Sequence, residues 1–345
     1  MILDTIGMFD AAAAFPEQLA RALDVSQRTI DIASLPEHEA IANVVLLGAG
    51  AAGQANALVL EAVGPTIPVP IVVHQGYGVP NFVDESTLVV AVSFDGETSE
   101  TLEAAQDALE DGATVVCVSG GGSLQTWATT NGLVHLPVMP DAPVERAALG
   151  SLAVPVLILL ERVGMYPGAE AWVSAAVSQA AIRRDELITE DNVARKLGRR
   201  LGRAFPIVYG GNGPGGAVAD FWKAQFNLNA KVAAFSNQVP ELTHEEIAGW
   251  GQDGDVTRQI FQVFLLRHDF EHPQVSSRLD AVEEVLVEVV GAVHVIEAAG
   301  EGLLAQIFDL ELIGQFVSLH AAVEQGIDPG PVPIVAEIAS RVGDA

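Results

Sequence analysis

The chain has 345 residues, half of them hydrophobic, and is therefore long enough to form two domains, each with its own core. Its 45 acidic and 17 basic residues give a formal net charge of −28, which argues against nucleic-acid partners and against binding to anionic membrane surfaces. Cys117 is the single cysteine, so an internal disulfide is excluded and a reducing, cytoplasmic location is expected.

The N-terminal half predicts helices followed by alternating strands and helices. Residues 2–33 are expected to form one or two helices, with Phe15, Leu19 and Leu23 on one face. Five apolar runs then predict strands, at residues 44–47, 68–74, 87–92, 114–119 and 133–138. Helices are expected at 54–63, from about 101 to 109, and at 145–163. This alternation predicts a doubly wound, mainly parallel sheet.

The C-terminal half repeats this pattern after an expected linker at 165–168 and a helical stretch at 169–200. Strands are predicted at 205–209, 260–266 and 293–297, and helices at 217–230, 275–290, 303–325 and after Pro331. A glycine-rich turn follows the first strand of each half, roughly half a chain apart, which indicates a duplicated α/β domain. We therefore expect an N-terminal domain at 1–165 and a C-terminal domain at 166–345.

Two loops in the N-terminal half are candidates for ligand binding, because ligands bind beyond the carboxyl ends of parallel strands. The first runs from Gly48 to Gly53 and matches the pattern G-x-G-x-x-G. A dinucleotide site would also need an acidic residue at the end of the second strand, where His74 and Gln75 stand. A nicotinamide cofactor, and with it an oxidoreductase, is thus disfavoured, and no cofactor is expected. The alternative is that the glycines only allow close packing.

The second loop, at residues 93–101, offers hydroxyl groups at the expected start of a helix. Ser93 and Thr98 together with free backbone N–H groups could cradle a phosphate. Simple capping of the helix by Thr98 explains the same residues equally well. Asp95 and Glu97 lie in this loop and would repel a phosphate if they faced it.

His244 and Arg146 are the candidate residues for acid–base chemistry. His244 lies between carboxylates, with Glu245 and Glu246 directly after it, a setting suited to moving a proton. Arg146 could clamp a phosphate or stabilise an enediolate, and the alternative is a solvated surface arginine. The other histidines show no ligand spacing, so no metal site is expected. Neither a signal peptide nor an apolar run of membrane-spanning length is expected.

Several motifs together resemble the bifunctional phosphoglucose/phosphomannose isomerases, which are built from two sugar-isomerase (SIS) domains. Residues 221–231, FWKAQFNLNAK, are similar to the family's W-K-x-Q-x-N-E-N-A-K, and residues 240–246, PELTHEE, to its P-E-L-N-H-N-E. Residues 93–101, SFDGETSET, resemble the phosphate loop S-Y-S-G-N-T-E-E-T. Residues 145–150, ERAALG, resemble P-R-A-A-L-G, and residues 326–329 resemble G-x-D-P.

The resemblance implies catalytic roles for His244, which would open the sugar ring, and for Arg146. Its implied substrate-binding positions are Gly48, Gly50, Ala52, Ser93, Gly96 and Thr98. In this family the histidine reaches the site from the other subunit, so the resemblance also implies a homodimer.

The departures from the family pattern fall on residues that carry its chemistry. The catalytic glutamate is replaced by Leu228, which cannot accept a proton, and a phosphate-binding serine is replaced by Ala52. In the second loop a serine has become Asp95 and an asparagine Glu97. Glu245 or Glu246 could replace the lost base.

These observations predict a divergent sugar-phosphate isomerase homologue whose aldose–ketose isomerase activity is weak or lost. Its ligand would be a small sugar phosphate or a related carbohydrate. A non-catalytic SIS-fold sensor or accessory protein is the alternative.

Overall fold

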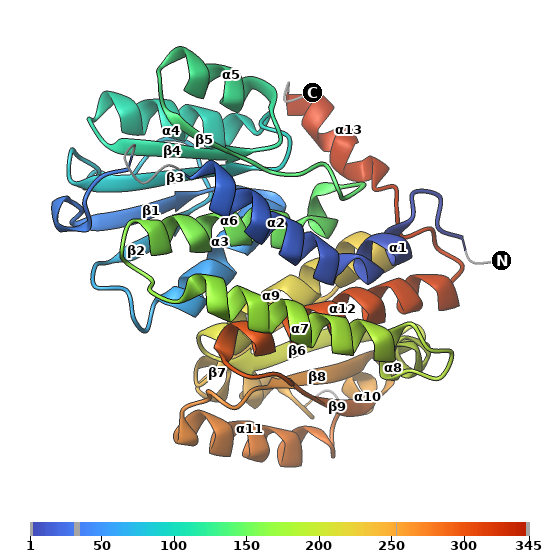
Figure 1. The fold of residues 1–345 in the computed structure, drawn as a ribbon. Coiled ribbons are helices and arrows are strands. Elements are labelled where there is room, and N and C mark those ends of the chain that lie inside the picture. Colours follow the sequence, from blue (N-terminus) through green and yellow to red (C-terminus); the bar gives the residue numbers. More distant parts are fainter. Residues whose placement is uncertain (1–2, 31–34, 253, 343–345) are drawn as a thin grey trace. The chain divides into compact units, whose positions relative to one another are not determined.

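A computed structural model describes residues 3–30, 35–252 and 254–342 (Figure 1). The chain forms two compact units. One comprises Ala14–Val177, and the other combines Met1–Ala13 with Ser178–Ala345. We call them the 14–177 unit and the 178–345 unit.

The 14–177 unit is built on a parallel sheet of five strands with the order β2-β1-β3-β4-β5. The strands are β1 (Asn43–Leu47), β2 (Ile71–His74), β3 (Thr87–Ser93), β4 (Thr114–Ser119) and β5 (Val134–Pro137). The inner strands are mainly apolar on both faces, and they are buried except at Asn43 and Thr114, as expected when helices cover both sides of a parallel sheet. Cys117 of β4 is one of these core residues.

Helices cover both faces of this sheet (Figure 1). They are α2 (Phe15–Thr29), α3 (Gly50–Val63), α4 (Ser99–Glu110), α5 (Gly122–Thr130) and α6 (Leu149–Arg162), with short 3₁₀ turns at His38–Ala40 and Glu145–Ala147. Ala105 of α4 and Leu124 of α5 pack with Val89 on one face. Helices α2, α3 and α6 pack together on the other. Helix α7 (Ala169–Leu187) begins in this unit and ends in the other.

The 178–345 unit contains a second parallel sheet, with the order β7-β6-β8-β9. Its strands are β6 (Phe205–Gly211), β7 (Phe235–Val239), β8 (Phe261–Arg267) and β9 (Ala292–Glu297). This order is the same as that of the first four strands in the other unit. The predicted α/β class with two doubly wound, parallel sheets is therefore confirmed.

The 178–345 unit has helices on both faces of its sheet. They are α1 (Met8–Ala13), α8 (Val193–Leu201), α9 (Pro214–Gln225), α10 (Val256–Ile260), α11 (Pro273–Leu286), α12 (Leu303–Glu324) and α13 (Pro333–Val342), with a π-helical turn at Phe226–Ala230 and 3₁₀ turns at Glu241–Thr243 and Glu246–Gly249. Leu279 of α11 packs on Tyr209 and Leu265 on one face. Trp222 of α9 contacts Phe264 on the other, where α12 covers α9.

Some elements differ from the prediction. Strand β7 was not predicted, because Ser236, Asn237 and Gln238 interrupt its apolar character at the edge of the sheet. Helix α5 was also not predicted, because it is short and only Leu124, Trp127 and Ala128 form its apolar face. The helix expected at 169–200 is two helices, because Asn192 caps α8 by accepting a hydrogen bond from Arg195 N at 2.8 Å. Of the helical range expected at 2–33, Ile2 and residues 31–33 lie outside the described residues.

Candidate functional site

The glycine loop leads from β1 directly into the first turn of α3. Gly50 has φ of +56°, a left-handed conformation that favours glycine. A Cβ at Gly48 would lie 2.9 Å from Asn56 Nδ2 and 3.1 Å from the Val92 carbonyl oxygen, so there is no room for a side chain. Ala52, one turn into the helix, is buried and also borders Gly48. The loop thus brings backbone N–H groups to the carboxyl edge of the sheet, beside the end of β3.

The second loop places two hydroxyl groups at the N-terminus of α4. Ser93 Oγ lies 2.9 Å from Thr98 Oγ1 and accepts a hydrogen bond from Gly96 N at 3.1 Å. Thr98 is the N-cap residue of α4, yet its side chain does not make the usual capping hydrogen bond. Gly96 has φ of +83°, and a Cβ there would collide with the Gly121 carbonyl oxygen at 2.0 Å. The hydroxyl pair is held at a helix N-terminus, where an anion is favoured.

The two acidic residues of this loop point in different directions. The Glu97 carboxylate accepts hydrogen bonds from Ser123 N at 3.0 Å and from Ser123 Oγ at 2.7 Å, so it is tied to the first turn of α5. Asp95 is exposed, and its Oδ1 accepts from Glu97 N at 3.0 Å. Of the two, Asp95 has the carboxylate that is not tied to another helix.

Glu145 is a carboxylate of this region that the sequence analysis did not single out. Its Oε1 lies 3.4 Å from the position that a Cβ on Gly50 would take, at the start of α3. Burial and repulsion by Asp95 raise the pKa of the Glu145 carboxyl, and the Arg146 charge partly opposes this. The signal was present in the motif, where Glu145 stands at the family's proline, directly before Arg146.

Arg146 is a buried residue, unlike a solvated surface arginine. Only 7% of it is exposed, and burial lowers the pKa of its guanidinium while Glu145 opposes that shift. An arginine remains charged in proteins despite such a shift. The 14–177 unit thus gathers both loops, a buried cation and two interacting carboxylates, Asp95 and Glu145, at one edge of its sheet.

The position of the family's glutamate lies in the 178–345 unit. Leu228 is half-buried in the π-helical turn that continues α9, and π-turns are frequent at functional sites. Its neighbour Asn229 is fully buried, and its Nδ2 donates to Gln225 Oε1 at 2.8 Å and to Ser318 Oγ at 3.0 Å. The polar residues around the turn are retained, and the ionisable side chain is absent from it.

His244 and the two glutamates after it also belong to the 178–345 unit. His244 is exposed and follows the short turn Glu241–Thr243. Glu245 is exposed as well. Glu246 accepts hydrogen bonds from the Tyr209 hydroxyl and from Asn237 Nδ2, so both of its oxygens are engaged by β6 and β7. Glu245 therefore has the more accessible carboxylate of the pair.

The described residues contain neither a metal-binding cluster nor a membrane-spanning helix. Within residues 3–30, 35–252 and 254–342, no three or more histidine, cysteine, aspartate or glutamate side chains come together in a way that could hold a metal ion. No helix in the same ranges is long and apolar enough to cross a membrane.

Comparison with known proteins identifies the family. Residues 190–342 match the model of the bacterial phosphoglucose isomerase C-terminal SIS domain. A bifunctional phosphoglucose/phosphomannose isomerase of Caldicellulosiruptor bescii is 30% identical over 98% of this chain and 99% of its own length. A protein of the same description from Thermoplasma acidophilum is 30% identical over 87% of this chain and 89% of its own.

The fold is shared with more distant proteins. The C-terminal domain of glucosamine-fructose-6-phosphate aminotransferase from Francisella tularensis superimposes with a TM-score of 0.71 at 15% identity, covering 94% of this chain and 98% of that one. At this level of identity the likeness concerns the fold alone. On the full-length sequence match, the chain belongs to the bifunctional phosphoglucose/phosphomannose isomerase family, with the architecture of two SIS domains.

Proposed function

We propose that this protein binds a sugar phosphate or a related carbohydrate at the loops of the 14–177 unit, and that its aldose–ketose isomerase activity is weak or lost. The observation that carries the binding proposal is the hydroxyl pair of Ser93 and Thr98 at the start of α4. Gly48, Gly50, Gly96 and Ala52 form the rest of the proposed binding loops. The family relationship supports a phosphosugar as the ligand class.

The proposed loss of activity rests on Leu228. A general base contributes roughly 10²–10⁴-fold to a proton transfer, and leucine cannot serve as one. If some isomerase activity remains, His244 would open the sugar ring and Arg146 would stabilise the negative charge of the enediolate. A carboxylate would have to move the proton between C1 and C2 of the sugar.

Three carboxylates are candidates for this base. Glu246 already accepts hydrogen bonds from Tyr209 and Asn237, which disfavours proton transfer to a ligand. Glu245 is exposed and could act only if its turn brought it to the ligand. Glu145 is the third, because burial and the Asp95 charge raise its pKa, which makes the carboxylate a better proton acceptor than an exposed glutamate.

A non-catalytic sensor or accessory protein is the second candidate function. It is favoured by the carboxylates of Asp95 and Glu145, which face each other closely enough to raise the pKa of Glu145. Such a pair weakens the binding of a doubly charged phosphate and suits a less anionic carbohydrate. We further propose a homodimer that acts in the cytoplasm on small molecules, without nucleic-acid or membrane partners.

The test is a coupled isomerase assay with glucose 6-phosphate and mannose 6-phosphate. We expect little or no turnover by the wild-type protein and a measurable gain in Leu228→Glu, with Leu228→Gln as the uncharged control of similar size. Robust wild-type turnover would refute the loss of activity. In that case Glu145→Gln, Glu245→Gln and His244→Ala would show which groups move the protons, and Glu246→Gln would serve as the carboxylate control.

A further inference from the structure

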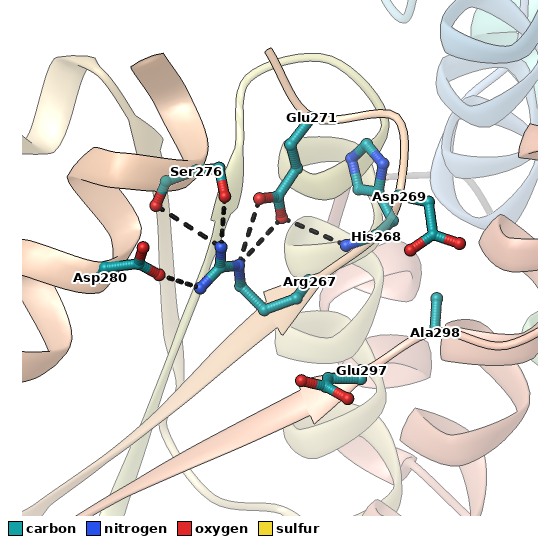
Figure 2. A pocket seen from close by; sticks show the side chains of 8 residues that line it. All are labelled: Arg267, His268, Asp269, Glu271, Ser276, Asp280, Glu297 and Ala298. Carbon is teal, nitrogen blue, oxygen red and sulfur yellow. Dashed lines mark hydrogen bonds and ion pairs between the residues drawn. The ribbon is translucent and has the colours of Figure 1, made fainter. Parts of the chain in front are cut away.

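A cavity of about 470 Å³ lies beyond the carboxyl ends of β8 and β9 in the 178–345 unit. Figure 2 shows Arg267 ending β8 with His268 directly after it, Glu297 ending β9, and Asp280 on α11 across from them. This is the edge of a doubly wound sheet at which ligands bind, and the volume is typical of small-molecule sites. The proposed sugar-phosphate loops belong to the other unit, so this cavity has no role in the function proposed above.

One wall of the cavity is fixed by the Arg267 side chain. Its Nε donates to both oxygens of Glu271, at 3.2 and 3.1 Å, and its NH1 donates to Asp280 Oδ1 at 2.7 Å (Figure 2). Its NH2 donates to Ser276 Oγ at 2.7 Å. The Glu271 side chain is only 4% exposed and that of Arg267 17%. The wall is thus preorganised, and two carboxylates already compensate the single positive charge.

Two further carboxylates of the lining keep acceptors available. Glu297 pairs with Arg267 through the backbone of β9, and its side chain makes no hydrogen bond or ion pair within residues 3–30, 35–252 and 254–342. Asp269 uses Oδ2 to accept from Gln306 Nε2 at 2.7 Å, and Oδ1 makes no hydrogen bond to any residue of the same ranges. With four carboxylates and one guanidinium, the lining repels a phosphate and attracts a cation.

His268 adds a neutral donor to the same lining. Its Nδ1 accepts a hydrogen bond from Phe270 N at 3.2 Å, which places the proton of the neutral ring on Nε2. Burial lowers the pKa of His268, so the ring is neutral at pH 7. Nε2 is buried and has no hydrogen-bond partner in the described part of the chain. This N–H lies near Gly215, and a rotation of the ring would have to bring it to the cavity, where a ligand oxygen would supply the missing acceptor.

We propose that this cavity binds a small, hydroxyl-rich molecule that carries a positively charged amino group, the chemical class of unphosphorylated amino sugars. The ammonium group would lie between Glu297 and Asp269, where charge-assisted hydrogen bonds are strongest. The hydroxyl groups would face the fixed carboxylates of the wall and the His268 N–H. The cavity would be a second carbohydrate site on the chain. It would select a positively charged sugar, whereas the proposed loops of the 14–177 unit would bind a negatively charged sugar phosphate.

The test is titration calorimetry of the full-length protein with glucosamine at pH 7. We expect one saturable site per chain, unaffected by saturating fructose 6-phosphate. N-acetylglucosamine, which has the same ring without the charge, should bind at least tenfold more weakly. No saturable glucosamine binding, equal affinity for the two sugars, or displacement by fructose 6-phosphate would each overturn the proposal.

Substitutions in the lining test whether glucosamine binds in this cavity. Asp269→Asn combined with Glu297→Gln keeps the shape of two exposed side chains and should weaken glucosamine binding at least tenfold. Glu284→Gln is the matched control, because Glu284 is exposed on α11 and does not line the cavity. Unfolding midpoints equal to that of the wild type would establish that both variants fold. Unchanged glucosamine affinity in the folded double variant would place any bound sugar elsewhere and refute the assignment.

Discussion

The Glu145 carboxylate lies against Gly50 at the first turn of α3, with Oε1 3.4 Å from the position of an added Cβ. An anion thus already stands at a helix N-terminus that, in a phosphosugar protein, would favour a ligand phosphate. Asp95 lies close enough to Glu145 to raise its pKa by repulsion. The proposed site therefore combines a cradle suited to an anion with carboxylates that oppose one.

We predict that Glu145→Gln strengthens the binding of fructose 6-phosphate by roughly three- to tenfold, because it removes a like charge from the site. Since the pKa of Glu145 is raised, the advantage of the variant should shrink as the pH falls and the wild-type carboxyl becomes protonated. Calorimetric titrations of both proteins across pH 5 to 8 measure this difference. Glu110→Gln, an exposed change at the far end of α4, is the control, and an equal gain there would contradict a local effect.

A second prediction concerns the two substituted loop positions. Ala52→Ser combined with Asp95→Ser should increase fructose 6-phosphate affinity by about tenfold or more, because each hydrogen bond to a charged group contributes roughly 1.5–3 kcal/mol. Titration calorimetry at pH 8, where the phosphate is fully charged, gives the comparison. Tight binding by the wild type, with no gain in the double variant, would show that Asp95 does not oppose the ligand.

The expected homodimer is a third prediction. His244 lies on an exposed turn of the 178–345 unit, and the family resemblance implies that this histidine completes the site of a partner subunit. Light scattering at low micromolar concentration should therefore give a mass near twice the 36.1 kDa of the chain. A clean monomer at that concentration would remove the shared-site role of His244.

The fold class was predictable because short segments of the sequence carry the patterns that define its strands, helices and turns. Apolar runs separated by helical segments and glycine turns define parallel sheets before any contact is known, and the two sheets have that form. Strand β7 was not predicted, because three polar residues follow Phe235 and the strand pairs with β6 on one side only. Its existence depends on β6, and a short polar sequence does not encode that pairing.

The candidate site was less predictable from the sequence, because the role of each side chain depends on which residues the fold brings next to it. Glu246 looked like a spare base in the sequence, whereas the fold brings it to the Tyr209 hydroxyl and Asn237. Glu145 looked incidental, whereas the fold sets it against Gly50. Whether a carboxylate is available as a base depends on hydrogen-bond partners and charges from other elements, which the local sequence does not show.

The last prediction concerns Glu311, a fully buried residue of α12. Neither carboxylate oxygen has a hydrogen-bond partner within the described ranges, and burial raises the pKa well above its ordinary value of 4.5. The folded protein thus retains a proton that the unfolded chain releases as the pH rises above that ordinary value. Stability should then fall with rising pH, by up to about 1.4 kcal/mol per pH unit, until the folded-state pKa is passed.

Glu311→Gln isolates this effect, because the amide has nearly the same shape and does not titrate. The free energy of unfolding of the wild type relative to Glu311→Gln should decrease from pH 5 to pH 8 in urea titrations. Glu301→Gln, an exposed position just before α12, should show a pH dependence close to that of the wild type. If the difference between wild type and Glu311→Gln stays constant over this range, the carboxyl is ionised in the folded protein. A compensating charge or solvent molecule must then reach it inside the unit.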